Sequence, residues 1–593
     1  MECRRKKYID VLKALAIMMV VLYHSGFLTF GYLGVELFFV ISGFLTTKSL
    51  WNRVVANTSS GESVAGCKSY YFEFELNRIV RLLPILLMAG IISMSLGFWL
   101  MLPDDYENLS ESVVATNLFG NNILAAITTK DYWDVVNEYK PLMHTWYVGV
   151  LMQFYIVYPI LFFLARLDKK NPKRTLIVML SALVVASLAV YFVTDDVAKR
   201  FYYLPSRFFE FGVGGIAALV YTPKAAKLSH KCFAYVCYAL LMALMLVNRE
   251  IIPASVRLVA VVALSVVSVV SGSSLENKVT ANRVFAKLGA ASFSIFVWHQ
   301  VVLAFYRYSI SNRFTIWGYA ALLAVVALLS WLTYHFVEQK TGKWLQEKKS
   351  KRVFYAVTVG AFIVLTCFAG YMYWRGGVVR DVPELYISKS EQVDHKAYND
   401  RVYQMDKPFE TDKRHWLVVG NSFGRDFANV ILESPVSDCV EVSYIYGEKY
   451  KNAKYMERFS SADRVFLSSM GTDEKDVEEM EQVCKSAGFN VDNLVIVGTK
   501  NFGESNGQFY AKRHRPDYFM QRTEIAPEYV ERNERLKALY GDRYLDLIGL
   551  VKDEKGTMPV FTPDHHFVSQ DCRHFSKGGT IWFGQLIDWE KYL

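Results

Sequence analysis

A short segment near the C-terminal end contains residues that could carry catalytic chemistry. Asp571 and His574 are three residues apart, so on one turn the carboxylate can orient the imidazole, and the imidazole can activate a nucleophile. Farther upstream, the apolar run 415–420 ends in Asn421 and Ser422, as a buried strand enters a tight turn. Ser422 is therefore a candidate catalytic residue, and the alternative is a serine that only caps a helix.

Ionisable side chains also occur inside strongly apolar stretches, where they are costly and usually mark a site, a pathway or a partner. Each histidine alone could be a satisfied interior residue, and the basic residues near helix ends could be snorkelling anchors. Arg207 and Glu210 share a helical face and form either a binding pair or a structural ion pair. Together the set predicts a polar cavity for an anionic or phosphate-bearing ligand, with a histidine as general base. The set comprises Lys13, His24, Glu36, Arg78, Arg81, His144, Arg207, Glu210, His299 and Glu338.

The elements that must position the second set are membrane-spanning helices. Hydrophobic residues make up 52% of the 593 residues and the mean hydropathy is +0.17, which indicates membrane insertion. A bilayer core requires about 20 mostly apolar residues per helix. Eleven stretches fit, at about 9–28, 31–50, 82–102, 144–166, 175–193, 202–221, 232–248, 252–272, 288–308, 316–337 and 353–374.

The sequence thus predicts a polytopic α-helical membrane domain of about ten helices at 1–345, with one linking helix at 346–375. A linker or domain extension follows at 376–414, and an α/β domain at 415–593. Three apolar runs in this last part end in small or polar residues and are separated by helical patterns, which predicts a parallel sheet. Catalytic groups in such folds collect at the carboxyl ends of the strands.

Basic residues concentrate in alternating loops between the apolar stretches, and the net charge is +9. The positive-inside rule then places the N-terminus in the cytoplasm and, with eleven spans, the C-terminal domain outside it. One membrane span more or fewer would place the C-terminal domain on the cytoplasmic side. Since no basic face is interleaved with aromatic residues, we expect a lipid bilayer and no nucleic acid as partner. The basic N-terminus and the first apolar run are expected to form a retained helix, not a cleaved signal peptide.

No metal centre is expected, because the eight cysteines include no Cys-x-x-Cys pair. Asp564, His565 and His566 form either a loop or a weak metal site. If the C-terminal domain is exported, Cys439, Cys484 and Cys572 allow one disulfide with one thiol left over, and three free thiols are the alternative.

Five segments of the apolar region together resemble the membrane acyltransferase family 3: 8–24, 34–44, Arg78-Ile-Val-Arg81 with Pro84, 144–146 and 294–299. The resemblance covers about residues 8–340. It implies an acetyl-type donor, expected to be acetyl-CoA, that is used at the cytoplasmic face, and transfer of the acyl group to an extracytoplasmic acceptor. It also implies His24 as the catalytic histidine, with ten residues between it and the basic residue Lys13, and Arg78 and Arg81 as contacts for the donor phosphates.

One position departs from this family's pattern. Many members carry an acid before Gln-Phe-Tyr, whereas this chain reads Val150-Leu-Met-Gln-Phe-Tyr155. Either that acid is dispensable, or its role falls to Glu36 or Glu210.

The C-terminal motifs, Gly420-Asn-Ser422 and Asp571-x-x-His574-Phe-Ser, resemble the SGNH hydrolase and esterase family. The resemblance implies Ser422 as nucleophile, His574 as base and Asp571 as orienting acid. It also implies oxyanion donors from the Ser422 backbone N–H, a glycine and an asparagine, for which Gly471 and Asn501 are candidates. The usual Gly-Asp-Ser is Gly-Asn-Ser here, and the changed residue is not the nucleophile.

An acyltransferase-3 region joined to an exported SGNH-type domain is similar to the bacterial polysaccharide O-acetyltransferases. The resemblance implies a multi-pass enzyme of the inner (plasma) membrane with its C-terminal domain in the periplasm or outside. The implied acceptor is a lipopolysaccharide (O-antigen), capsule or peptidoglycan sugar, and no cofactor is tightly bound. Two alternatives stay open: a membrane-anchored carbohydrate acetylesterase, and a transporter with an inactive exported domain.

Overall fold

The structure is a computed structural model, and it describes residues 7–52, 64–129, 135–221, 231–247, 251–271, 282–344, 348–390, 395–500, 502–571 and 573–593. The chain separates into two units by its contacts. The helical unit comprises Met1–Leu96, Leu109–Arg307 and Arg313–Tyr371. The α/β unit comprises Gly97–Asn108, Tyr308–Asn312 and Met372–Leu593.

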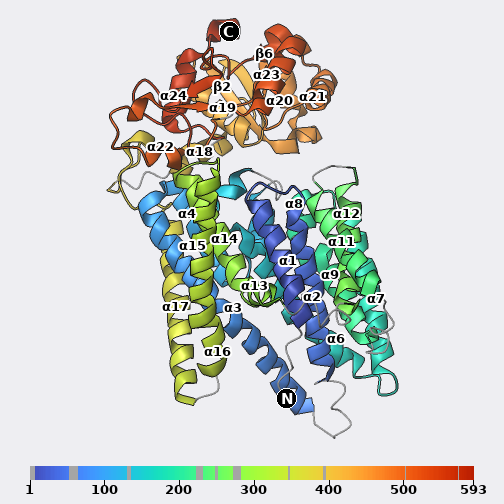
Figure 1. The fold of residues 1–593 in the computed structure, drawn as a ribbon. Helices are drawn as coiled ribbons and strands as arrows, with labels where there is room; N and C mark the ends of the chain where they lie inside the picture. Colours follow the sequence, from blue (N-terminus) through green and yellow to red (C-terminus); the bar gives the residue numbers. More distant parts are fainter. Residues whose placement is uncertain are drawn as a thin grey trace. The chain divides into compact units, whose positions relative to one another are not determined.

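Each of the eleven stretches predicted to span a bilayer contains a helix (Figure 1). These helices are α1 (Lys7–His24), α2 (Gly34–Leu50), α3 (Val64–Leu100), α6 (Trp146–Ala165), α7 (Pro172–Val193), α9 (Leu204–Val220), α11 (Lys231–Leu246), α12 (Ala254–Ser271), α14 (Ser292–Ser309), α15 (Ile316–Thr333) and α17 (Lys348–Trp374). Shorter helices lie between them: α4 (Pro103–Asn117), α5 (Asn121–Thr128), α8 (Val197–Tyr202), α13 (Arg283–Ala290) and α16 (Gln339–Trp344).

Among the described residues, seven helices are long and apolar enough to cross a membrane, and α13 with α14, bent by 69°, makes up to eight. The seven are α2, α3, α6, α7, α12, α15 and α17. Helix α1 includes Lys7, Asp10 and Lys13 within 18 residues, and α9 has only 17 residues. The chain is therefore a multi-pass membrane protein, while the count of eleven crossings stays a prediction.

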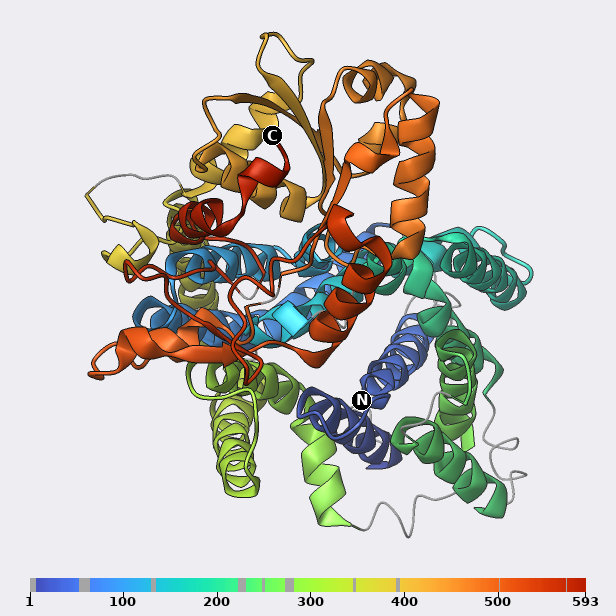
Figure 2. The same ribbon diagram turned by 90° about the horizontal axis from the view of Figure 1, so that it is seen from above.

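Close backbone approaches hold the helical unit together. A Cβ on Gly43 of α2 would lie 2.1 Å from the carbonyl oxygen of Phe211, and one on Gly214 of α9 would lie 2.2 Å from that of Val40. Only glycine allows α2 and α9 to cross at this distance, as is typical of helices packed inside a membrane. Helices α11 and α12 lie side by side in both views (Figures 1 and 2).

The α/β unit contains a five-stranded parallel sheet in the order β2-β1-β3-β4-β6. The strands are β1 (Arg414–Gly420), β2 (Val440–Tyr446), β3 (Arg464–Leu467), β4 (Leu494–Val497) and β6 (Tyr544–Leu545). A separate antiparallel pair joins β5 (Arg522–Glu524) to β7 (Thr557–Pro559). The predicted α/β class with a parallel sheet is confirmed. The three predicted apolar runs contain β1, β3 and β4.

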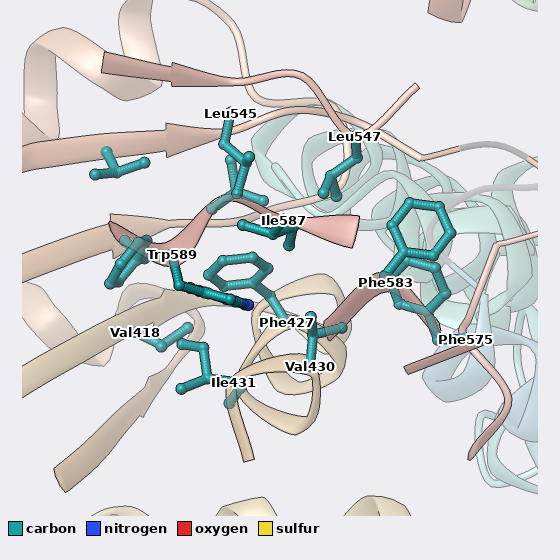
Figure 3. Packing of buried hydrophobic residues seen from close by; sticks show 14 of the residues in the cluster. Val418, Phe427, Val430, Ile431, Leu545, Leu547, Phe575, Phe583, Ile587 and Trp589 are labelled. Carbon is teal, nitrogen blue, oxygen red and sulfur yellow. The ribbon is translucent and has the colours of Figure 1, made fainter. Parts of the chain in front are cut away.

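Both faces of this sheet are buried, so residues of β1 pack alternately on two cores. Val418 lies in a core with Phe427, Val430 and Ile431 of α19 (Ser422–Leu432) and Phe583 of α24 (Lys577–Leu586), as Figure 3 shows. The neighbouring Leu417 and Val419 face a second core that includes residues of α21 (Glu474–Ser486) and α23 (Pro527–Tyr540). Helices on both faces are what a parallel sheet requires.

Residues 376–414, expected to be a linker or a domain extension, pack into the α/β unit. They contain α18 (His395–Asp400) and the short turns Pro383–Leu385 and Arg401–Met405. Val402 is fully buried in the core of Figure 3, and Val382 and Leu385 are buried in a third core. These contacts favour an extension of the domain over a free linker.

Candidate active sites

The turn between β1 and α19 presents Ser422. A Cβ on Gly420 would lie 1.7 Å from the carbonyl oxygen of Ser468, so the turn requires glycine there. Asn421 is the N-cap of α19: its side-chain oxygen accepts hydrogen bonds from the backbone N–H of Phe423 (3.0 Å) and of Met470 (3.2 Å). Asn421 therefore does the capping, and Ser422 is the first residue of the helix. Both bonds need only an acceptor oxygen, which explains how asparagine can replace the usual aspartate.

The structure brings Ser422, His574 and Asp571 together in a chain of hydrogen bonds. His574 Nε2 lies 2.9 Å from Ser422 Oγ, and His574 Nδ1 lies 2.8 Å from Asp571 Oδ2. The other oxygen of Asp571 accepts the backbone N–H groups of Arg573 (2.6 Å) and His574 (2.7 Å). The His574 side chain is 25% exposed, so a substrate can reach it. This is the arrangement of an activated serine nucleophile.

The charge on Asp571 fixes the roles of the two histidine nitrogens. Burial opposes ionisation of this carboxyl, but the charge of His574 and the hydrogen bonds donated by His574 and Arg573 outweigh burial, so the pKa of Asp571 lies well below its usual range. The ionised Asp571 accepts the Nδ1–H of His574. The lone pair of Nε2 then faces Ser422 and can accept its hydroxyl proton.

Asp426 and Lys500 form a buried ion pair that supports this geometry, and the sequence reasoning missed it. Asp426 lies one turn after Ser422 on α19, and Lys500 follows β4; their side chains are 1% and 4% exposed. Asp426 also accepts the backbone N–H of Phe575 at 3.0 Å. Burial opposes its ionisation, but Lys500, His574 and Arg425 lower the pKa of Asp426 overall. The hydrogen bond between Phe575 and Asp426 thus holds the segment after His574 against α19, the helix that carries Ser422.

We expect Asp426→Asn to weaken both stability and catalysis, because it leaves the Lys500 ammonium buried without a counter-charge. Breaking a buried pair on one side costs about 3 kcal/mol or more. Thermal unfolding of the full-length protein should therefore occur at a lower temperature. The double variant Asp426→Asn with Lys500→Met should recover part of the loss, since it removes both charges. An unchanged unfolding temperature in the single variant would contradict a supporting role for the pair.

The oxyanion candidates and the cysteines of the α/β unit lie only partly within the described residues. Gly471 follows Met470, which hydrogen-bonds to Asn421, so this oxyanion candidate lies in the loop beside the nucleophile turn. Asn501, the other candidate, and Cys572 lie outside the described residues. Cys439 and Cys484 are free thiols.

The histidine-rich loop near the triad makes ring contacts. His565 stacks on Phe519, and His566 stacks on Tyr386. Within the described part of the chain, no group of three or more His, Cys, Asp or Glu residues could hold a metal ion. The loop interpretation of Asp564, His565 and His566 therefore has the better support.

Three histidines gather in the helical unit. The ring of His299 lies 5.2 Å from that of His24 and 5.5 Å from that of His144. His299 Nδ1 lies 2.7 Å from the carbonyl oxygen of Phe296 and so donates to it, while its Nε2 has no hydrogen-bond partner among the described residues. Arg307, which the sequence reasoning missed, donates to the carbonyl oxygen of His24 at the end of α1 and pairs with Glu138 (3.3 Å). A charged residue in the apolar stretch 288–308 was the signal available.

Three predicted basic residues line one cavity in the helical unit. Lys13, Arg78 and Arg81 lie together in the lining of this cavity. The Arg78 guanidinium lies 4.9 Å from the Phe74 ring centre, and Arg81 pairs with Glu338 at 3.5 Å. Their shared cavity favours a binding role over the alternative of snorkelling anchors at helix ends.

An aromatic wall connects this cavity to the histidines. Tyr147 and Phe296 line the cavity, and their ring centres are 5.2 Å apart. The Phe296 ring also lies 4.9 Å from His144 and 5.9 Å from His299. The cationic cavity and the histidine cluster are thus neighbours across Phe296.

Glu36, Arg207 and Glu210 form a closed ion cluster and do not line this cavity. Arg207 Nη1 lies 3.1 Å from Glu36 and 2.8 Å from Glu210, and all three side chains are at most 1% exposed. Arg207 also donates to the carbonyl oxygen of Phe201. Their geometry favours the structural-pair interpretation. Leu151, at the position where many family members carry an acid, lines the cavity instead.

Comparison with known proteins agrees with the helical unit. Residues 6–335, more than half of the chain, match the acyltransferase domain family, and the chain belongs to this family. The predicted resemblance is thereby confirmed for this region, and the parallel sheet of the α/β unit agrees with the predicted SGNH-type part.

Several relatives carry the name O-acetyltransferase OatA. The protein of Staphylococcus aureus strain MRSA252 is 25% identical over 385 residues, which cover 60% of this chain and 61% of the relative. That of strain NCTC 8325 is 25% identical over 356 residues, 56% of this chain and 57% of the relative. The chain thus matches about three fifths of the length of these relatives. No solved structure matches the chain.

Proposed function

We propose that this protein is an O-acyltransferase that moves acetyl groups from a cytoplasmic donor, acetyl-CoA, across the membrane to hydroxyl groups of a cell-surface polysaccharide. The observation that carries the proposal is the Ser422–His574–Asp571 chain of hydrogen bonds in a protein of the acyltransferase family. The relatives named O-acetyltransferase support acetyl as the group transferred.

The first stage takes place in the helical unit. Coenzyme A carries several phosphates, and Lys13, Arg78 and Arg81 offer charge-assisted hydrogen bonds to them in one cavity. The thioester end then lies toward Phe296 and the histidine cluster beyond it. His24 acts there as the catalytic histidine: an imidazole nitrogen attacks the thioester carbonyl, the C–S bond breaks, and the imidazole proton passes to the departing sulfur. CoA is thereby released as the free thiol, and the acetyl group is held on His24.

The second stage takes place at Ser422. His574 Nε2 accepts the hydroxyl proton while Oγ attacks the carbonyl of the acetyl group brought from His24, and Asp571 stabilises the resulting imidazolium. The bond between the acetyl carbon and the His24 nitrogen breaks, and that nitrogen takes up the proton from His574. The negative charge on the carbonyl oxygen develops at the N-terminus of the 11-residue helix α19, where backbone N–H groups and the helix dipole stabilise it. A sugar hydroxyl then gives its proton to His574 and attacks the acetyl-serine, which releases the acetylated sugar and free Ser422.

This scheme requires the N-terminus in the cytoplasm and the α/β unit on the extracytoplasmic side of the plasma membrane. Both assignments are proposals that rest on the alternating basic loops and on eleven crossings. The acceptor belongs to the lipopolysaccharide, capsule or peptidoglycan class, and no tightly bound cofactor is needed for either stage.

Hydrolysis is the second candidate function, because the Ser422 triad would also serve an esterase if water replaced the sugar hydroxyl. An esterase needs no acetyl-CoA, so the cationic cavity favours transfer. Dependence of sugar acetylation on acetyl-CoA separates the two functions, since an esterase would remove acetyl groups with or without it.

The donor cavity is tested by Arg78→Gln. We expect its affinity for acetyl-CoA, measured by calorimetry on the full-length protein in lipid nanodiscs, to fall about tenfold or more, because one charged hydrogen-bond donor is lost. Arg174→Gln is the matched control, since Arg174 is exposed on α7 and does not line the cavity. Equal affinities of all three proteins would show that the donor binds elsewhere.

A further inference from the structure

We infer that the sugar acetylated at Ser422 carries an acidic group, a carboxylate or a phosphate diester, close to the accepting hydroxyl. This inference rests on the proposed function and names the chemistry of the acceptor. The observation behind it is a pair of arginine side chains that contact the loop beside the nucleophile.

The loop after β3 borders the nucleophile turn. Met470 donates its backbone N–H to the side chain of Asn421, the residue before Ser422. The carbonyl oxygen of Ser468 lies against Gly420, and it would be 3.1 Å from a Cβ on Gly424. A group that rests on Met470 or Gly471 is therefore at the edge of the site where the acyl group forms.

Two guanidinium groups rest on this loop from different elements. Arg573, directly before His574, places Nη1 3.6 Å from the sulfur of Met470. Arg532 of α23 places Nη1 3.7 Å from the position of a Cβ on Gly471. Positions 532 and 573 are far apart in the sequence, so the fold brings two positive charges to Met470 and Gly471.

Four acidic side chains of the α/β unit are already engaged with other partners. Asp571 binds His574, and Asp426 binds Lys500. On α23, Arg535 pairs with Glu474 at 3.0 Å and Lys537 pairs with Asp546 at 2.8 Å.

Arg532 differs from its neighbours on α23. It forms no ion pair with any residue that the structure describes, its side chain is half-buried, and its guanidinium lies 5.9 Å from the Tyr529 ring centre. Arginine stays charged at every physiological pH, and its planar fork matches the two oxygens of a carboxylate or a phosphate. An uncompensated arginine at the rim of a catalytic serine is thus suited to orient an anionic acceptor.

Two acceptors that differ only in charge test this inference. Full-length protein in nanodiscs is given a soluble acetyl ester as donor, with either a uronic-acid oligosaccharide or the same oligosaccharide after its carboxyl groups have been reduced to alcohols. We expect the acidic acceptor to have a KM about tenfold lower than the neutral one. An oligosaccharide that carries a phosphodiester side group, compared with the same oligosaccharide without that group, distinguishes the second source of negative charge.

The variants locate the effect. Arg532→Gln should remove the difference in KM between acidic and neutral acceptors, and Arg532→Lys should restore part of it because the charge returns. Arg535→Gln, on the same helix but paired with Glu474, should keep the wild-type difference. Hydrolysis of the soluble ester in the same samples reports on Ser422.

The outcomes separate this inference from the proposed function. Equal use of acidic and neutral acceptors by the wild-type protein, or a preference that survives in Arg532→Gln, overturns the inference and leaves the transferase intact. Ester hydrolysis without transfer to any of the four oligosaccharides overturns the inference and favours the esterase.

Discussion

Replacing Ser422 by alanine should lower acetyl transfer to the polysaccharide at least about a thousandfold, because the acceptor of the acyl group is lost. His574 and Asp571 would stay in place but would have no hydroxyl to activate. The measurement is the acetate content of surface polysaccharides, determined by mass spectrometry in cells that carry either the wild-type gene or the variant, with membrane levels of the protein compared in parallel.

Ser469→Ala is the matched control for this prediction. Ser469 lies in the loop beside the nucleophile turn, near Gly420, yet it is outside the hydrogen-bonded chain of the triad. It should keep most of the activity. If Ser422→Ala retained full transfer, the second stage of the mechanism would be wrong. If acetylation rose, the α/β unit would be an esterase and the direction of the chemistry would be reversed.

Replacing His24 by alanine should abolish acetylation that depends on acetyl-CoA, with a loss of about a thousandfold or more. The triad at Ser422 should still hydrolyse a soluble acetyl ester, because that reaction bypasses the helical unit. Acetylation from acetyl-CoA and ester hydrolysis, both measured on the purified full-length protein, provide the two readouts. Their separation would assign His24 to the first stage alone.

The control for His24 is His335→Ala. His335 is also in the helical unit, but its ring packs against Trp331 and is not among the three clustered histidines. We expect this variant to behave like the wild type. Equal losses in both variants would point to a general effect on folding and not to the chemistry of His24, and loss of ester hydrolysis in His24→Ala would contradict two separate stages.

The two motifs that contain Ser422, Asp571 and His574 could be located from sequence because their signals are local. Gly420-Asn-Ser422 ends an apolar strand, and Asp571 and His574 lie on one turn, so local sequence predicted each motif. The pairing of the two motifs, which are 152 residues apart, was implied by the resemblance to the SGNH family. The supporting pair of Asp426 and Lys500 could not be found in this way, because neither residue belongs to a motif of that resemblance. The two residues are 74 apart in the sequence and meet only when β4 and α19 fold together. Pairings at such distances depend on the tertiary fold.

The sequence predicted a parallel sheet with strands at β1, β3 and β4, but it did not reveal β2 and β6. Strand β2 reads Val-Glu-Val-Ser-Tyr-Ile-Tyr, in which polar residues alternate with apolar ones, so it lacks the continuous apolar run that revealed β1. Strand β6 has two residues, too few for any periodicity.

The helical unit shows the same limit. The length of the apolar stretches predicted a helix in every span. Ionisable residues inside or beside these stretches were candidates because buried charge is costly, and they include His24, His144, His299, Lys13, Arg78 and Arg81. The sequence could not predict which of these residues lie together in one site. The structure places the histidines in one cluster and the basic residues in one cavity, and it leaves Arg207 with Glu36 and Glu210.

The most direct test of the two-stage account follows the acetyl group itself. The full-length protein is reconstituted in proteoliposomes, isotopically labelled acetyl-CoA is supplied only on the side of the N-terminus, and the reaction is quenched in acid before the peptide containing Ser422 is analysed by mass spectrometry. The account predicts labelled acetyl on Ser422 in the wild-type protein and none in His24→Ala. Labelled polysaccharide without labelled Ser422 at any time, or labelled Ser422 in the absence of His24, would contradict it.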